Sequence, residues 1–177
     1  MPATSPRFRW SRVATLLIVA FLVTGCGEVE MHHLEMRKGR AYLKKAFKPY
    51  SGSVKSYYPA KEGEDRQLYM EGLFDDGLRD GTWITYRADG WRIEDKYIFG
   101  RRNGVIKTFD AKSKVRKEEN FFNGRLHGAS TYKDSKGGVE RNLYFDQGAQ
   151  ISYPHPKAKV EFEAKVKEGP SDDLLRQ

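Results

Sequence analysis

Residues 97–109 read Tyr-Ile-Phe-Gly-Arg-Arg-Asn-Gly-Val-Ile-Lys-Thr-Phe, and this pattern decides the fold. An aromatic residue stands three positions before a glycine, a second glycine follows four positions later, and another aromatic residue comes after that. The pattern recurs along the chain in steps of 23, 24 and 24 residues, with the first glycines at Gly77, Gly100, Gly124 and Gly148. A fixed period of this length is typical of stacked supersecondary units.

Each unit is expected to be a β-hairpin. A Gly-x-x-x-Gly segment offers two positions where positive φ or a close backbone approach costs little, which suits a tight connection between antiparallel strands. The following residues are rich in Thr, Val, Ile and aromatics, which favour strands, and each run ends in a polar turn sequence. The expected strands are 82–86, 91–99, 105–109, 115–122, 129–132 and 139–145. We therefore predict an all-β fold, an antiparallel β-hairpin repeat array forming a single-layer meander. Its structural glycines would be Gly52, Gly77, Gly81, Gly100, Gly104, Gly124, Gly128 and Gly148.

A degenerate unit precedes the clear ones, with Tyr57 five positions after Gly52. Upstream of it, two short apolar runs flank Arg37-Lys38-Gly39-Arg40 and predict an opening hairpin. Near the C-terminus, residues 157–168 alternate as a strand would, but they are rich in helix-forming residues, so helix and strand both stay open. The expected organisation is a signal peptide at 1–25, a tether at 26–33, the repeat domain at 34–150, and an appended element with a short charged tail at 151–177.

The first 25 residues have the pattern of a secretory signal. Three arginines precede the apolar run 13–23, which is too short for a membrane span. Residues 22–26, Leu-Val-Thr-Gly-Cys, resemble a bacterial lipoprotein lipobox, which implies cleavage after Gly25 and acylation of Cys26. Two or three acyl chains would anchor the protein permanently. We expect an exported protein anchored by lipid at Cys26 in the bacterial envelope, with Gly27 favouring the outer membrane over the inner; a transmembrane anchor is the alternative.

Composition suits an exported domain. Cys26 is the only cysteine, so no disulfide is available once it is acylated. Removal of residues 1–25 leaves 152 of the 177 residues, enough for one domain with a modest core. That segment holds three arginines and no acid, so its removal lowers the net charge from +8 to +5. A charge of this size gives no argument for a nucleic-acid partner.

Charge changes sign along the chain. Residues 37–55 hold seven bases and no acid, residues 60–95 ten acids and five bases, and residues 101–136 ten bases and four acids. Pairing between neighbouring strands would explain this banding. The alternative is a surface that steers a charged partner. In that case an acidic protein patch or anionic headgroups would contact Arg101, Arg102, Lys107 and Arg125.

Catalytic motifs are scarce. His32 and His33 could hold a metal with a nearby glutamate, but no second cluster at ligand spacing completes the site. Glu118 and Glu119 are neighbours on an expected strand and would face opposite sides of the sheet. The sequence contains no nucleophile elbow, phosphate loop or zinc-protease motif. We expect a non-enzymatic protein without cofactor or metal site, in which the aromatic residues pack across strands.

Residues 97–109 and 121–132 resemble MORN-repeat variants, and Pro49-Tyr50-Ser51-Gly52 is similar to the segment that opens bacterial proteins of the YwqK-type antitoxin family. The resemblance covers roughly residues 34–150. It implies a hairpin array that works by binding, in this case a partner protein of the cell envelope. Neutralisation of a toxin, as an antitoxin or immunity protein, is one alternative that the resemblance implies, and binding of anionic lipid is another.

Overall fold

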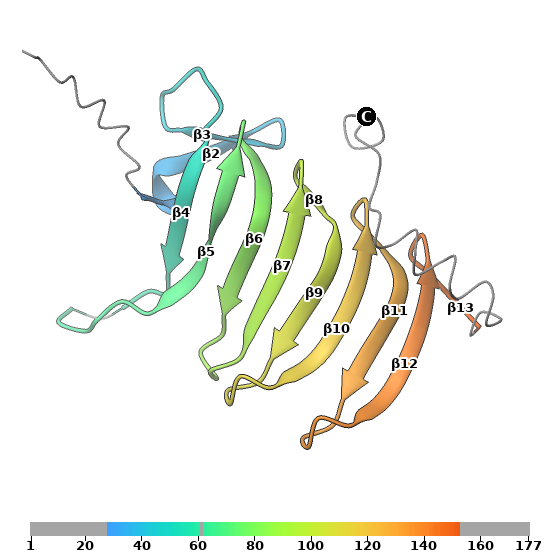
Figure 1. The fold of residues 1–177 in the computed structure, drawn as a ribbon. Helices are drawn as coiled ribbons and strands as arrows, with labels where there is room; N and C mark the ends of the chain where they lie inside the picture. Colours follow the sequence, from blue (N-terminus) through green and yellow to red (C-terminus); the bar gives the residue numbers. More distant parts are fainter. Residues whose placement is uncertain (1–27, 61, 153–177) are drawn as a thin grey trace, which may run out of the picture.

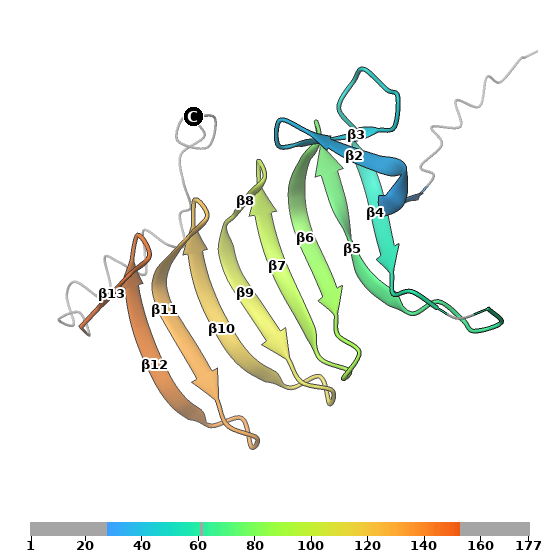
Figure 2. The ribbon, with the colours of Figure 1, turned by 180° about the vertical axis from the view of Figure 1, so that it is seen from behind.

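The computed structural model describes residues 28–60 and 62–152. These residues form one long, curved, single-layered sheet, with a two-stranded sheet lying across one end (Figure 1). The view from behind shows the same single layer (Figure 2). Strands of the long sheet follow each other in chain order, which confirms the predicted all-β meander. Among the described residues, no helix is long and apolar enough to cross a membrane.

The small sheet pairs β2 (Leu34–Arg37) with β3 (Arg40–Leu43). A short 3-10 turn, η1 (Met31–His33), precedes it. Neighbouring strands of the long sheet run antiparallel, except that β1 lies parallel to β4. The long sheet consists of β1 (Val29–Glu30), β4 (Gly52–Tyr57), β5 (Leu68–Asp75), β6 (Leu78–Tyr86), β7 (Arg92–Ile98), β8 (Arg101–Arg102), β9 (Gly104–Phe109), β10 (Val115–Phe122), β11 (Arg125–Lys133), β12 (Val139–Asp146) and β13 (Ala149–Ile151).

The first glycine of each unit closes a two-residue turn. In the turn between β7 and β8, Phe99 and Gly100 have φ of 47° and 79°. A type I′ turn requires positive φ at both of its central residues. The backbone twist of such a turn matches the twist of the two strands that it joins, so it suits a two-residue hairpin. The same combination occurs at Asp76-Gly77, Asn123-Gly124 and Gln147-Gly148, and at Lys38-Gly39 in the small sheet.

A backbone hydrogen bond ties each turn to the unit before it. The N–H of the turn glycine donates to the carbonyl oxygen of the residue two positions after the preceding turn glycine. The repeat period of 23 or 24 residues therefore sets the register of the stack, because it brings this donor and this acceptor together. The pairs are Gly100 to Arg79, Gly124 to Arg102 and Gly148 to Leu126, each at 2.8 Å.

The second glycine of each unit does not belong to the turn, and this part of the prediction was wrong. Gly81, Gly104 and Gly128 have positive φ but lie at irregularities where the pairing with the preceding strand shifts. A bulge lets a strand continue past an unpaired residue. For that reason β6 already begins at Leu78 and β11 at Arg125, upstream of the strand starts that the sequence suggested.

The turn glycines differ in what a side chain would cost. At Gly124 a Cβ would meet no atom within 4 Å, so Gly124→Ala should lose about 1–2 kcal/mol of unfolding free energy from positive φ alone. Gly77→Ala should lose more, because its Cβ would also lie 2.8 Å from the carbonyl oxygen of Ala41. Urea unfolding checks both values, with Arg125→Ala as the surface control. Equal stability of Gly124→Ala and Arg125→Ala would contradict the turn assignment.

The core lies where the two sheets meet. Trp83 is its largest side chain, 1% exposed, and its indole N–H donates to the carbonyl oxygen of Leu73 at 3.0 Å. The Trp83 ring meets those of Phe74 and Tyr97 edge-on, with centroids 5.0 and 6.3 Å apart, which is a favourable aromatic geometry. The predicted cross-strand aromatic packing is therefore present. The buried cluster comprises Leu34, Ala41, Val54, Phe74, Trp83 and Tyr97.

The opening hairpin exists, but it covers the long sheet instead of continuing it. Ala41 donates its N–H to the carbonyl oxygen of Gly77 at 2.8 Å, and the N–H of Tyr50 donates to the carbonyl oxygen of Ala41 at 2.8 Å. The hairpin buries Leu34 and Ala41 against the aromatic side chains of the long sheet. An isolated sheet face with large apolar groups would be exposed, and this hairpin shields it at the N-terminal end.

Residues 28–33, which the sequence assigned to a tether, belong to the fold instead. Val29 in β1 pairs with Val54 in β4. This pairing satisfies backbone groups on the outer edge of β4 that would otherwise be an open sheet edge. Next to it, Glu28 forms an ion pair with Lys55 at 2.8 Å. The predicted signal peptide, Cys26 and the segment 157–168 lie outside the described residues.

Candidate functional site

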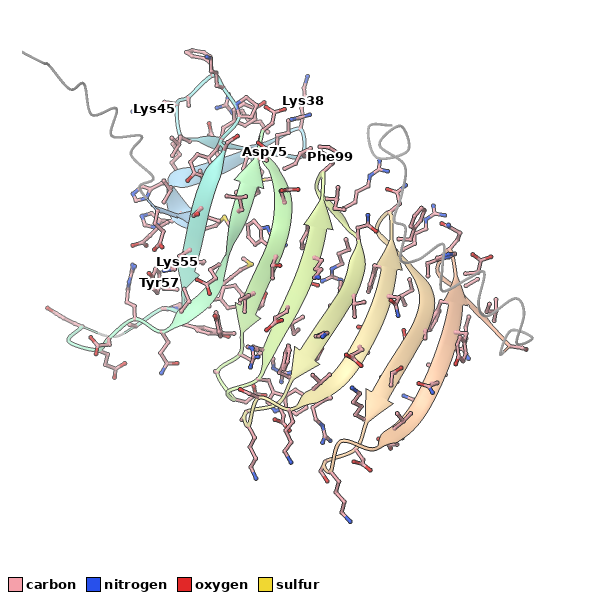
Figure 3. All side chains as sticks on the ribbon, viewed as in Figure 1. Lys38, Lys45, Lys55, Tyr57, Asp75 and Phe99 are labelled. Atoms are coloured by element: carbon pink, nitrogen blue, oxygen red, sulfur yellow. The ribbon has the colours of Figure 1, made fainter. Side chains whose placement is uncertain are left out.

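A groove of about 1010 Å³ lies between the small sheet and the adjacent turns of the long sheet. Its lining is apolar in part and carries charges of both signs. Figure 3 shows Lys38, Asp75 and Phe99 gathered at this end of the molecule from three different elements. The side chains that line it include Met36, Lys38, Arg40, Asp75, Asp76, Arg79, Phe99 and Arg101.

Arg79 is held in this groove by aromatic rings. Its guanidinium carbon lies 4.3 Å from the ring centroid of Trp83 and 5.4 Å from that of Tyr97. One guanidinium nitrogen also donates to the Tyr97 hydroxyl at 3.1 Å. Stacking on aromatic faces fixes an arginine without neutralising it. No carboxylate forms an ion pair with Arg79 in the part of the chain that the structure describes.

Arg102 occupies the equivalent place in the next unit, and there the charge is neutralised. Its Nε lies 3.1 Å from Oδ1 of Asp95, and a terminal nitrogen lies 3.2 Å from Oδ2. Burial is the largest single influence and lowers the pKa of Arg102, but the charges and hydrogen bonds of Asp95 and Tyr97 together outweigh it, so the pKa is raised. Asp95 stands five residues before the turn glycine of its unit, Gly100.

Five residues before Gly77, the unit of Arg79 has Gly72 in place of a carboxylate. A Cβ at Gly72 would lie 2.2 Å from the ring of Trp83, so only glycine fits beneath the indole. Packing of Trp83 therefore excludes the residue that would have neutralised Arg79. The lack of a carboxylate partner for Arg79 is a consequence of how the core is built.

The four cations proposed from the sequence do not form one site, and only Arg101 lines the groove. Arg101 donates to the side-chain oxygen of Asn123 at 2.6 Å. Of the other three, Arg102 is paired with Asp95, Lys107 lies 3.8 Å from Glu118, and Arg125 is exposed outside the groove. Sequence reasoning missed Arg79. Alignment of the units could have found it, since it shows Gly72 where the next unit has Asp95.

The face of the long sheet opposite Trp83 carries charges that pair across strands. Lys107 and Lys133 approach the two carboxylate oxygens of Glu118 at 3.8 and 2.8 Å. The positive charges of Lys107 and Lys133, which belong to the basic stretch 101–136, are therefore paired between strands and are not free for a partner. One row across this face runs Lys55, Glu71, Ile84, Glu94, Lys107 and Glu118.

Tyr86 belongs to this face, and its hydroxyl donates to Glu71 at 2.7 Å. Burial, followed by the hydrogen bond and charge of Glu71, raises the pKa of Tyr86 to about 12. The neutral phenol is thus favoured in the folded state. Its contribution to stability is complete below the ordinary pKa of about 10 and is lost as pH rises toward 12. Absorbance titration should show a late-titrating tyrosine that disappears in Tyr86→Phe; an unchanged titration in that variant would contradict the contact.

Metal-binding side chains are sparse among residues 28–60 and 62–152. His32 pairs with Glu30 at 3.1 Å, and no group of three or more His, Cys, Asp or Glu is placed to hold a metal ion there. Glu119 pairs with Lys117 on the face opposite Glu118, so the two adjacent carboxylates are separated, as predicted.

Comparisons with known proteins find no matching family model and no matching curated protein.

Proposed function

We propose that this chain is a non-enzymatic, lipid-anchored envelope protein that binds a segment of a partner protein in the groove beside Arg79. The unneutralised guanidinium of Arg79 carries the proposal. Trp83 and Tyr97 hold it in place, so a carboxylate would find its donors already oriented. Charge-assisted pairs between arginine and carboxylate are among the stronger hydrogen-bonded contacts.

The lining defines the rest of the ligand. Met36 and Phe99 are 61% and 38% exposed, so an apolar side chain beside the carboxylate would cover apolar surface. Four cations line the groove against two carboxylates, and one of these, Asp76, is already ion-paired with Arg40. An acidic segment with an apolar side chain fits this lining best. A toxin of the kind that the resemblance implies would be one such partner.

Site-specific photo-crosslinking in the native membrane tests the proposal. A benzoylphenylalanine replaces Phe99 in the full-length chain, and a second chain carries it at Val139, which is 60% exposed on β12, far from the groove. We expect a discrete protein adduct from position 99 and none from position 139. Arg79→Gln should abolish the adduct, whereas Arg125→Gln should preserve it. Adducts that are equal at the two positions, or that survive Arg79→Gln, would refute the proposed site.

A further inference from the structure

The loop between β3 and β4 presents an aromatic side chain to solvent. Its sequence is Lys44-Lys45-Ala46-Phe47-Lys48, and Phe47 is 96% exposed. The other large apolar side chains that are exposed in the described chain keep more of their surface covered. In Figure 3, Lys45 lies on this loop at the outer end of the molecule. Phe47 therefore contributes almost nothing to packing within the described chain.

Contacts at the base of the loop hold it in this position. The N–H of Ala46 donates to the carbonyl oxygen of Leu43 at 2.9 Å, and the Arg37 guanidinium donates to the carbonyl oxygen of Ala46. Arg37 itself is stacked on Tyr42, 4.0 Å from the ring centroid. Exposure of Phe47 is thus a feature of a supported loop, and the side chain points outward from a fixed backbone.

The charged residues of the loop are all positive. Lys44, Lys45 and Lys48 surround Phe47, and none of them forms an ion pair within residues 28–60 and 62–152. The wider run 37–55 contains no acid. An aromatic side chain between lysines suits the interface of an anionic bilayer, because the ring enters the headgroup region while the ammonium groups stay with the phosphates.

The place of the loop in the fold points to the same partner. Both ribbon views show it beside β2, β3 and β4, at the end of the long sheet (Figures 1 and 2), and β1 pairs with β4 at this end. Glu28, paired with Lys55, stands two residues after the predicted lipidation site, and two residues span at most about 7 Å. An acyl chain on Cys26 would therefore hold this end of the sheet close to lipid.

We propose that residues 44–48 form a second membrane contact, in which Phe47 enters the interface of an anionic bilayer and Lys44, Lys45 and Lys48 contact lipid phosphates. Together with the anchor, this contact fixes the orientation of the sheet on the membrane. This proposal rests on the lipid anchor of the proposed function, but it does not depend on the groove or on any protein partner.

A fluorescent reporter on the loop tests this contact. The full-length chain is reconstituted into vesicles of phosphatidylcholine, with or without phosphatidylglycerol, with an environment-sensitive dye on Phe47→Cys. A matched chain carries the dye on Ser135→Cys, in the turn between β11 and β12 at the far end of the array, and the unaltered chain sets the labelling baseline. We expect a blue shift at position 47 with phosphatidylglycerol, weakened by salt, and no shift at position 135.

The lysines have their own variant. With the dye at position 47, the combined change Lys44→Ser, Lys45→Ser and Lys48→Ser should remove the dependence on phosphatidylglycerol. An unshifted dye at position 47 in vesicle-bound protein would overturn the proposal, as would an equal shift at position 135. Neither result would affect crosslinking from the groove, so failure of this contact and failure of the groove are distinguishable.

Discussion

Trp83→Ala should cost about 3–5 kcal/mol of unfolding free energy, the range for truncation of a large buried aromatic residue. Trp83 is almost fully buried, contacts Phe74 and Tyr97, and supports the guanidinium of Arg79. Its removal leaves a cavity between the small sheet and the long sheet and takes away a hydrogen bond to Leu73. Urea unfolding followed by circular dichroism measures the loss.

Trp91→Ala is the matched control, because Trp91 lies at a turn outside the buried cluster. We expect the control to lose much less stability than Trp83→Ala. A similar loss in the two variants would mean that the junction of the two sheets is not the main core.

Gly72→Val should also destabilise the fold strongly, at or above the upper end of the about 1–3 kcal/mol typical of overpacking. A Cβ at this position would come within 2.2 Å of the Trp83 ring, and the ring cannot retreat because Phe74 and Tyr97 flank it. Strand propensity alone predicts the opposite sign, since valine is the better strand residue. Unfolding midpoints of the two chains separate these expectations.

A double-mutant cycle shows whether the clash is the cause. In Gly72→Val combined with Trp83→Ala, the valine occupies space that the indole has vacated, so the combined loss should be smaller than the sum of the single losses. Additive losses would mean that Gly72 is required for a reason other than contact with Trp83.

The fold was largely predictable because it repeats. The aromatic and glycine spacing of residues 97–109 recurs, and each recurrence adds weight to the same hairpin. The role of the second glycine could not be predicted in this way. Gly81 and Gly77 both favour positive φ, and only the pairing of strands distinguishes a bulge from a turn. The position of the β2–β3 hairpin across the long sheet was likewise beyond reach, since local patterns predict a hairpin but not the face that it covers.

The candidate site depended on contacts that sequence patterns do not contain. Charge runs drew attention to Arg102 and Lys107, yet both are paired with carboxylates on neighbouring strands. Arg79 lies in the acidic stretch of the chain, so its local composition suggested a neutralised side chain. Its freedom from a carboxylate arises because Gly72 and Trp83 pack together.

The role of Arg79 is tested most directly by transplanting the neutralised arrangement of the next unit into the groove. The combined change Gly72→Asp and Trp83→Ile gives the unit of Arg79 the residues that the next unit has at the same places, Asp95 and Ile106. Circular dichroism first verifies that the sheet is retained, and crosslinking from position 99 is then measured in the native membrane. We predict that the adduct disappears in this double variant but persists in Trp83→Ile alone, because only the double variant introduces a carboxylate that neutralises Arg79. An undiminished adduct in the folded double variant would contradict the proposed role of Arg79 in partner binding.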